Sequence, residues 1–146
     1  PYDVPNLFSD EFNTLDKKHN ATFEFCEAEY FMAYRDGKIV GRIAAIINHK
    51  ANKKWNRRSV RFGWLDFIDD KEVLRLLLKA VEDYGKAKGM TEIVGPLGFT
   101  DMDPEGMLTW GFDKLGTMPT RYNYTYYRKY MEKMEGVAND KYYVEY

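Results

Sequence analysis

The stretch that decides the fold is residues 59–96, SVRFGWLDFIDDKEVLRLLLKAVEDYGKAKGMTEIVGP. Its first ten residues are mostly β-branched, aromatic or aliphatic, which is typical of a strand buried on both faces. A segment of helical period follows, and the face expected to be buried comprises Val73, Leu76, Leu77, Ala80, Val81 and Tyr84. Residues 91–94 predict a second, short buried strand. A strand, a helix and a strand of these lengths predict a right-handed crossover that joins two parallel strands.

Both ends of this helix carry their own signals. Asp69 with Glu72 is similar to a capping box, and both carboxylates suit the positive end of a helix dipole. Lys86 and Lys88, followed by Gly89, are typical of a helix C-terminus. We therefore expect the helix to start beside Asp69 and to end before Gly89.

A β-hairpin is predicted before the crossover. Residues 28–34 alternate aromatic and small side chains, and Asp36-Gly37 is a strong signal for a two-residue turn. Residues 38–48 then form the return strand, whose many isoleucines predict a central position in the sheet. Gly41 within it predicts a bulge or a close approach of another element.

Shorter elements are expected towards both ends of the chain. Ser9 is the expected cap of a short helix that turns Phe12 and Leu15 inward. Residues 122–134 predict another helix, and residues 141–146 predict a final strand. The expected fold class is α/β (α+β), with a mixed sheet, an antiparallel hairpin, a strand-helix-strand crossover and flanking helices.

Composition limits the number of domains and the classes of partner. The chain has 146 residues and is 45% hydrophobic, which suffices for one domain with its own core. A net charge of -1 argues against nonspecific binding to nucleic acid or to anionic membranes, and no signal peptide or spanning segment is visible. Cys26 is the only cysteine, which fits a reducing, cytoplasmic compartment. Because the chain begins at Pro1 without an initiator Met, we expect an excised or truncated part of a longer chain.

Two segments allow both a functional and a structural interpretation. Residues 49–58 (HKANKKWNRR) are basic and could hold a phosphate or nucleic acid, but a solvated hairpin connection is favoured. The tyrosines of residues 122–134 could stack nucleobases, although packing in a core or groove is favoured at this net charge. Neither segment supplies the Cys and His partners that a zinc site needs.

Residues 97–121 form a long irregular stretch, and a loop of this length in a compact domain is usually functional or a lid. The first half of a calcium-binding loop is matched by Asp101, Asp103, Glu105 and Gly106. However, Phe112 stands where the last ligand of such a loop, a bidentate Glu, belongs. We therefore favour a role for these residues in turn formation, and no metal is expected.

The order of hairpin, crossover, helix and final strand resembles that of the GNAT superfamily of N-acetyltransferases. The turn DGKIVGRI is similar to the one that joins the second and third strands of that family. The segments FGWLDFIDDKEV, GMTEIVGPLGFTDMDPEGML and GFDKLGTMPTRYNYTYY resemble a group of bacterial GNAT-like proteins of unassigned substrate. Those relatives look like two-domain proteins. The resemblance thus implies that residues 1–146 are a single GNAT-like domain and that a second GNAT-like domain is its partner.

The resemblance implies acetyl-CoA as the acyl donor and a small-molecule or peptide amine as the acceptor. In the family, the pyrophosphate of the coenzyme binds N–H groups at a glycine-containing turn that starts the crossover helix. The matching cofactor-binding positions here are Asp66, Phe67, Ile68, Asp69 and Asp70. They include no glycine, and Asp69 and Asp70 place two negative charges where the pyrophosphate would bind. We therefore expect this chain alone to bind acetyl-CoA poorly.

Catalytic roles are also implied by the resemblance. The family tyrosine that protonates the leaving thiolate corresponds to Met131, so Tyr126 and Tyr127, with Tyr130 beside them, are the candidates for that role. The candidates for the carboxylate that takes the amine proton are Asp66, Asp101, Asp103 and Glu105. Two functions remain open: an acyltransferase that acts on an amine, or a non-catalytic GNAT-shaped module that supports a second domain or partner. A nucleic-acid binder is a third, less favoured hypothesis.

Overall fold

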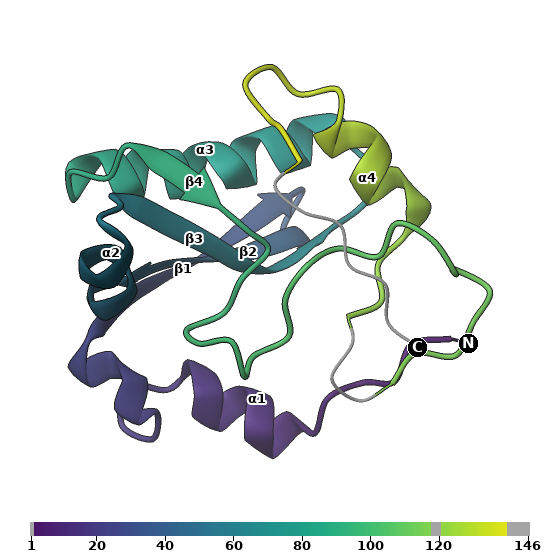
Figure 1. Cartoon of the computed structure of the whole chain (residues 1–146). Helices are drawn as coiled ribbons and strands as arrows, with labels where there is room; N and C mark the ends of the chain where they lie inside the picture. Colours follow the sequence, from purple (N-terminus) through teal and green to yellow (C-terminus); the bar gives the residue numbers. More distant parts are fainter. Residues whose placement is uncertain (1, 118–120, 140–146) are drawn as a thin grey trace.

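The computed structural model describes residues 2–117 and 121–139, and a four-stranded sheet in the order β1-β2-β3-β4 forms its centre (Figure 1). The strands are β1 (Cys26–Arg35), β2 (Lys38–Asn48), β3 (Ser59–Phe67) and β4 (Glu92–Val94). β1, β2 and β3 are antiparallel neighbours, and β4 runs parallel to β3. The protein therefore has the mixed α/β fold that the sequence predicts. The expected final strand, residues 141–146, lies outside the described residues.

The predicted hairpin is confirmed. Asp36 (φ 50°) and Gly37 (φ 75°) both have the positive φ of a type I′ turn, and β2 lies between β1 and β3 as a central strand. Gly41 is a site of close approach: a Cβ there would lie 2.8 Å from Leu77 Cδ1 and 3.0 Å from Val73 Cγ1. Glycine thus lets the helix of the crossover lie directly on β2.

The crossover helix is α3 (Lys71–Ala87), and it covers one face of the sheet (Figure 1). Its buried residues are Val73, Leu74, Leu77, Leu78, Val81 and Gly85. The expectation that Leu76 is buried is wrong, since its side chain is 50% exposed. The buried stripe includes Leu74 and Leu78 in its place, because the contact with β2 at Gly41 fixes the rotation of the helix.

The helix start also differs from the prediction. Asp70, not Asp69, is the N-cap: its carboxylate accepts a hydrogen bond from the Glu72 backbone N–H at 2.8 Å. The Asp69 carboxylate instead accepts a hydrogen bond from the Tyr130 hydroxyl at 2.6 Å. The two adjacent aspartates therefore have different partners. The sequence alone does not show which of them caps the helix.

The other face of the sheet is covered by α1 (Phe8–Leu15) (Figure 1). It also packs against η1 (Ala21–Glu24) and the buried ring of Phe99. Two expectations for α1 are wrong. The residue at its N-cap is Leu7, without a side-chain hydrogen bond, so Ser9 is no cap, and Phe12 is 54% exposed and does not point inward. A helix this short takes its orientation from the few contacts it makes with the sheet.

Residues 49–58 do not form the expected loop, because most of them belong to α2 (His49–Trp55). The Asn48 side chain accepts a hydrogen bond from the Ala51 N–H at 2.8 Å, and Asn56 ends the helix in a left-handed conformation. The last described helix, α4 (Thr125–Met131), is shorter than the predicted 122–134. Residues 97–117 contain no helix or strand, as expected. Within the described ranges, no helix is long and apolar enough to span a lipid bilayer.

Candidate functional site

The C-terminal half of β3 is where the sequence-predicted site residues meet. β4 pairs with β3 only from Ser59 to Arg61, so the rest of this edge has no partner strand among the described residues. The Leu97 N–H donates to the Phe62 carbonyl oxygen at 2.8 Å, just beyond the last pair. The remaining edge, up to Phe67, is therefore available to side chains from other parts of the chain.

Tyrosines of α4 occupy this edge at Phe67. The Tyr126 hydroxyl donates to the Phe67 carbonyl oxygen at 2.6 Å, and the Phe67 N–H donates to the Tyr127 hydroxyl oxygen at 3.1 Å. The Tyr127 hydroxyl in turn lies 3.4 Å from Asp66 Oδ1, to which it donates. Both polar backbone groups of Phe67 on this edge are thus satisfied by α4, an arrangement called here the tyrosine clamp (Tyr126, Tyr127 and Phe67).

The protonation of these phenols follows from their surroundings. Burial, with the nearby Asp69 carboxylate as a second cause, raises the pKa of Tyr126 to about 12. Burial also raises the pKa of Tyr127. Both hydroxyls therefore keep their protons at neutral pH, and the proton of Tyr126 is shared with the Phe67 carbonyl oxygen. This places the two candidate acids in structural hydrogen bonds.

The start of α3 is closed by the protein's own carboxylates. Asp70 caps the helix and also pairs with Arg35, whose Nη2 lies 2.7 Å from Asp70 Oδ2. The hydrogen bond from Arg35 lowers the pKa of Asp70 below its ordinary value of 3.8. Asp70 is thus ionised at neutral pH and already fills the anion-binding position at the helix N-terminus. Of the five predicted cofactor-binding positions, only the last therefore lies at that terminus.

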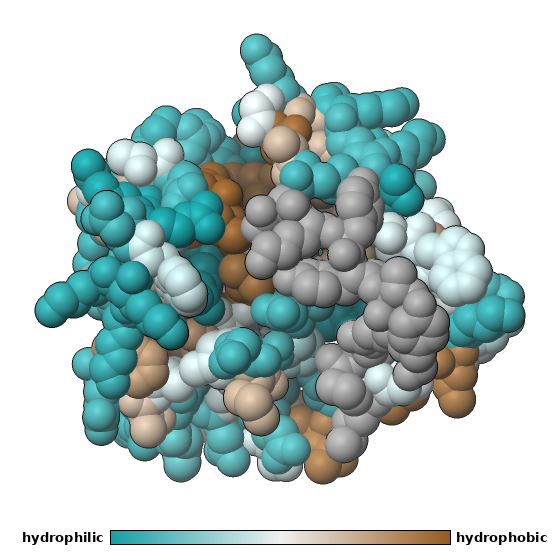
Figure 2. Space-filling model, in the orientation of Figure 1, coloured by the Kyte–Doolittle hydropathy of each residue, from teal (hydrophilic) through white to brown (hydrophobic). Residues whose placement is uncertain are grey.

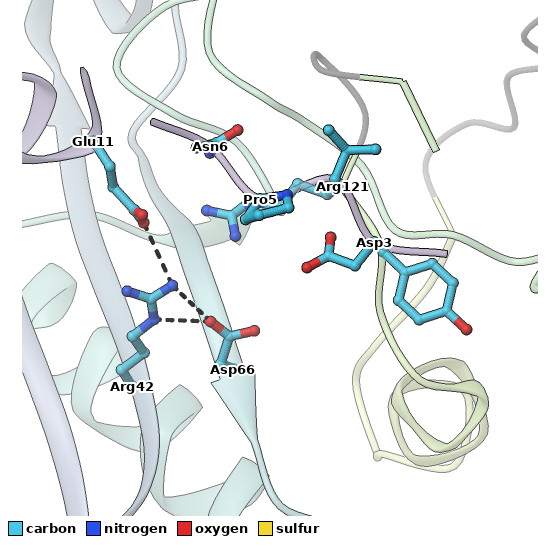
Figure 3. Close-up of a pocket in the computed structure, with 9 residues that line it drawn as sticks. Asp3, Pro5, Asn6, Glu11, Arg42, Asp66 and Arg121 are labelled. Atoms are coloured by element: carbon cyan, nitrogen blue, oxygen red, sulfur yellow. Dashed lines mark hydrogen bonds and ion pairs between the residues drawn. The ribbon is translucent and has the colours of Figure 1, made fainter. Parts of the chain in front are cut away.

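A polar pocket of about 180 Å³ lies on the α1 side of the same strand ends (Figure 3). It is lined by Asp3, Val4, Pro5, Asn6, Glu11, Arg42, Asp66, Arg121 and Tyr122. These residues come from the N-terminal segment, α1, β2, β3 and the segment before α4. Three carboxylates and two guanidinium groups surround the space, so its lining carries a formal charge of one negative unit.

An ion-pair network spans the floor of this polar pocket. Arg42 and Asp66 are direct partners in the β2–β3 register, and Arg42 Nε and Nη2 both lie 2.8 Å from Asp66 Oδ2. Glu11 points from α1 towards the same guanidinium, with Oε1 3.4 Å from Arg42 Nη2 (Figure 3). Asp66 therefore has one oxygen bound by Arg42 and the other by Tyr127, so the polar pocket and the tyrosine clamp share it.

Two polar atoms beside this network lack hydrogen-bond partners in the described part of the chain. They are Trp64 Nε1 and Glu11 Oε1; both are shielded from solvent, and Glu11 Oε1 has only its 3.4 Å ion pair with Arg42 Nη2. Trp64 is 7% exposed, has φ 48° within β3, and its ring lies 5.8 Å from the Arg121 guanidinium carbon. A buried polar atom without a partner is costly, and such atoms and strained backbone occur together at binding sites.

The other candidate bases lie elsewhere. Asp101 and Glu105 are exposed, and Asp103 accepts a hydrogen bond from the Thr100 N–H at 3.0 Å within the loop after β4. None of the three lines the polar pocket. Among residues 2–117 and 121–139, no cluster of three or more His, Cys, Asp or Glu side chains could hold a metal ion. Of the four candidate bases, Asp66 is therefore the one that lines the polar pocket.

Sequence reasoning missed Glu11, Arg42 and Arg121. Arg42 carried a usable signal, since it is the one charged residue inside the buried stretch of KIVGRIAAIIN. A charge in a central strand needs a partner, and the antiparallel register supplies Asp66. Glu11 and Arg121 gave no such signal, because only the tertiary structure brings their distant segments to the end of β3.

Comparison with known proteins identifies two relatives of this segment. The bacterial ceramide synthase of Caulobacter vibrioides (strain NA1000 / CB15N) is 35% identical over 111 residues, which are 75% of this chain and 29% of that protein. Protein YghO of Escherichia coli (strain K12) is 32% identical over 110 residues, which are 75% of this chain and 28% of that protein. The chain thus spans less than a third of the length of these curated relatives. No family model and no solved structure matches it.

Proposed function

We propose that this chain is a GNAT-like domain of an acyltransferase, an enzyme that moves an acyl group from a coenzyme A thioester to an amine. Three features support the proposal. The order of elements resembles that superfamily, the sheet opens beyond β4, and a carboxylate-lined cavity lies beside that opening. A relative over 75% of the chain is named a ceramide synthase, and a ceramide is by definition an N-acylated amine, so this name fits the same class of reaction.

The observation that carries the proposal is the position of Asp66. Its carboxylate is fixed by Arg42 from one side and by Tyr127 from the other, and it borders a polar cavity open to a small amine. An amine must lose a proton as it attacks a thioester, and a positioned carboxylate is a suitable acceptor. Fixing that carboxylate from two sides holds it in the geometry that proton transfer requires.

The experiment for this function is an acylation assay with the whole chain, acetyl-CoA and a panel of primary amines. We expect transfer to an amine, and we expect Asp66→Asn to reduce kcat at least tenfold, since general-base catalysis contributes about 10²–10⁴-fold. Glu24→Gln is the matched control, because Glu24 is exposed and lies outside the polar pocket. Equal loss in both variants, or transfer that is unaffected by Asp66→Asn, would contradict the role of Asp66.

A second candidate function has its own observation. Asp70 caps the start of α3, and the tyrosine clamp binds the Phe67 backbone. The positions at which the family binds its acyl carrier are therefore blocked. This favours a non-catalytic module that supports a second GNAT-like domain of a longer protein or another partner. No turnover with any amine, together with capture of that partner, would select the module over the enzyme.

In either case we propose a cytoplasmic location, which suits a single buried cysteine.

A further inference from the structure

We propose that α2 and the residues after it form a contact surface for an anionic lipid bilayer. The surface consists of four cations and one tryptophan, called here the α2 patch: Lys50, Lys53, Lys54, Arg58 and Trp55. It lies before the start of β3, whereas the polar pocket lies at the other end of that strand. The α2 patch is therefore a second site, and it does not depend on the proposed function.

Positive charge is concentrated in this part of the chain. The whole chain has a net charge of -1, yet residues 49–58 carry five Lys and Arg side chains and no Asp or Glu. Lys50, Lys53 and Lys54 have the i, i+3, i+4 spacing of one helix face, and all three are exposed. One face of α2 thus presents three ammonium groups to the surroundings.

The opposite face of α2 holds the helix against the sheet. The Asn52 side-chain amide donates to the Ser59 carbonyl oxygen at 2.9 Å, and the Ser59 hydroxyl donates to Asn52 Oδ1 at 2.7 Å. At the N-terminus, the Asn48 side chain accepts from the Ala51 N–H. These hydrogen bonds fix the rotation of the helix, so the lysine face is turned outward by the fold.

The protein does not compensate the charges of this face. The three lysines have no ion-pair partner among the described residues, and two carboxylates at the same end of the sheet are already engaged. Glu92 is held by Arg57 at 2.6 Å, and Glu27 is held by Lys88 at 2.6 Å. Arg58 donates to a backbone carbonyl oxygen, which carries no net charge, so its own charge also remains. The α2 patch is therefore complementary to an anionic surface.

Trp55 supplies the apolar part of the α2 patch. Its side chain is 66% exposed at the end of α2, and Lys54 Nζ lies 4.8 Å from its ring centroid. A tryptophan ring prefers the boundary of a bilayer, where it contacts acyl chains while its N–H reaches the headgroups. Lysine side chains can place their hydrocarbon stems in the same layer and their ammonium groups at the phosphates. Lysines beside an exposed tryptophan are thus typical of an interfacial helix.

Helix stability does not account for this composition. Lys53 and Lys54 lie in the last turn, where cations suit the helix dipole. Lys50 lies in the first turn, where the same dipole disfavours a cation, and Trp55 leaves a large apolar ring in water. An anionic surface with an apolar interior would stabilise both of these residues.

A nucleic acid suits the α2 patch less well than a bilayer does. Single strands bind by stacking bases on open aromatic faces, but Lys54 already covers one face of the Trp55 ring. Proteins that hold a duplex commonly contact about 6–10 phosphates, which is more than the four cations of the α2 patch supply. A bilayer requires only that the cations and the ring reach the same plane.

The rest of the domain permits this approach. Figure 1 shows α2 at one end of the sheet and α4 at the other, and Figure 2, in the same orientation, shows mainly hydrophilic side chains over the α2 end. Asp66 of the polar pocket is about 23 Å along β3 from Ser59. Because the Debye length is about 10 Å at 0.1 M salt, the carboxylates of the polar pocket would not repel the bilayer that α2 contacts.

The test measures binding of the whole chain to lipid vesicles by cosedimentation. Vesicles that contain phosphatidylglycerol as well as phosphatidylcholine should bind the chain, and vesicles of phosphatidylcholine alone should bind it far more weakly. At about 1 M salt, where the Debye length is about 3 Å, this preference should be lost. The fluorescence of Trp55, measured in a Trp110→Phe background, should shift to the blue on binding, because the ring leaves water.

Lysine variants separate charge from folding. A lysine near an anionic surface contributes about fivefold in affinity, so Lys50→Gln, Lys53→Gln and Lys54→Gln together should weaken binding about 10²-fold. Arginine at the same three positions should retain binding. The matched control applies the same change of net charge to three lysines that are exposed elsewhere, and it should leave binding unchanged; the substitutions are Lys38→Gln, Lys71→Gln and Lys129→Gln.

Tryptophan variants test the apolar contribution. Trp55→Ser should weaken binding about fivefold and remove the blue shift, whereas Trp55→Phe should retain most of the affinity. Trp110→Ser is the matched control, because Trp110 is 81% exposed and lies outside α2. Circular dichroism of each variant checks that the fold is retained, as the exposure of these side chains leads us to expect.

Several outcomes would overturn the proposal. No binding to the anionic vesicles, or equal binding to neutral ones, contradicts it. So does an equal loss of binding in the control variant of three lysines, since net charge alone would then explain the result. Tighter binding of double-stranded DNA than of anionic vesicles, through the lysines of α2, would assign the α2 patch to a nucleic acid instead.

Discussion

Asp66, Asp69 and Asp70 lie within five positions of one another, yet each has a different task. Asp66 is the last residue but one of β3, and its side chain lines the polar pocket. Asp69 accepts a hydrogen bond from Tyr130, and Asp70 caps α3. The strand ends at Phe67 and the helix begins at Lys71, so the backbone turns between them and sends three similar side chains in different directions.

The first residue-scale prediction concerns Tyr127. Tyr127→Phe removes a hydroxyl that accepts from the buried Phe67 N–H, and it leaves that N–H without a partner. An unsatisfied buried donor costs about 1–3 kcal/mol, so chemical denaturation should show a loss of stability of that size. Tyr124→Phe is the matched control, because Tyr124 is 62% exposed. A similar loss in both variants would show that the tyrosine clamp contributes nothing specific.

The second residue-scale prediction concerns acid. Because the hydrogen bond from Arg35 lowers the pKa of Asp70 in the folded state, its contribution to stability is present above the unfolded value, near 3.8. It is lost as the pH falls through the lower, folded value. Asp70→Asn keeps a capping side chain but removes the charge.

Urea denaturation at a series of pH values measures this effect. The variant should be less stable than the native chain at neutral pH, and the difference should shrink as the pH falls below about 3.8 and vanish only below the lower pKa that Asp70 has in the folded state. Glu24→Gln should follow the native curve, since Glu24 is exposed. A difference that stays constant across the whole range would mean that the charge of Asp70 is not what stabilises the helix start.

At the scale of elements, α3 shows why a helical period alone does not fix which residues are buried. The sequence pattern allows the buried stripe to include either Leu76 or the pair Leu74 and Leu78. Contact with β2 decides between them, since Gly41 leaves room for Leu77 directly above the strand. Rotation of the helix is therefore a property of the helix–sheet contact.

This rotation gives a matched pair of variants. Leu77→Ala should destabilise the chain by about 2–5 kcal/mol, because Leu77 is 2% exposed and its loss leaves a cavity. Leu76→Ala should change stability by no more than about 0.5 kcal/mol, since Leu76 is 50% exposed. Denaturation midpoints of the two variants decide the matter, and a larger effect at Leu76 would refute the observed register.

At the scale of the whole molecule, the sheet separates two different environments. The α3 face holds the larger apolar core, and the α1 face holds a smaller core that ends in the polar pocket. The tyrosine clamp belongs to the larger core and lies at the open edge of β3. Under the proposed function, an acyl carrier and an amine would approach the same strand end from different sides, which is the arrangement that acyl transfer requires.

The prediction at this scale concerns acetyl-CoA. Calorimetry with the whole chain should show no binding in the low micromolar range, because Asp70 occupies the start of α3 and the tyrosine clamp covers the Phe67 backbone. The variant with Tyr126→Phe and Tyr127→Phe should bind more tightly if the clamp is the obstacle. Replacing Asp69 and Asp70 by glycine should tighten the binding of acetyl-CoA if the negative charge at the helix start is the obstacle. Tight binding by the native chain would contradict both explanations.

Much of the fold was predictable from local pattern. The hairpin, the central position of β2, the crossover and its parallel strand were all predicted from periodicity and turn residues, and all are confirmed. Most errors fall on short elements, namely α1, α2 and the ends of α4, while on the longer α3 the N-cap and the burial of Leu76 differ from the prediction. Short helices have little intrinsic stability, so tertiary contacts decide where they form and which side they bury.

The candidate site was predictable only in part. Asp66 and the two tyrosines were named from sequence, and the fold brings them together. Their arrangement as a clamp, and the presence of Glu11, Arg42 and Arg121, were not foreseen. Hydrogen bonds between residues about 60 positions apart follow from how elements pack, which no local pattern encodes.

The sequence by itself determined the order and type of the main elements, because alternating and helical periods of apolar residues act over a few neighbours at a time. Only the tertiary structure decided the rotation of α3, the outward apolar side of α1 and the lining of the polar pocket. The reason is that these features depend on close packing between distant segments. At these contacts, burial and charge compensation outweigh the conformational preference of any single residue.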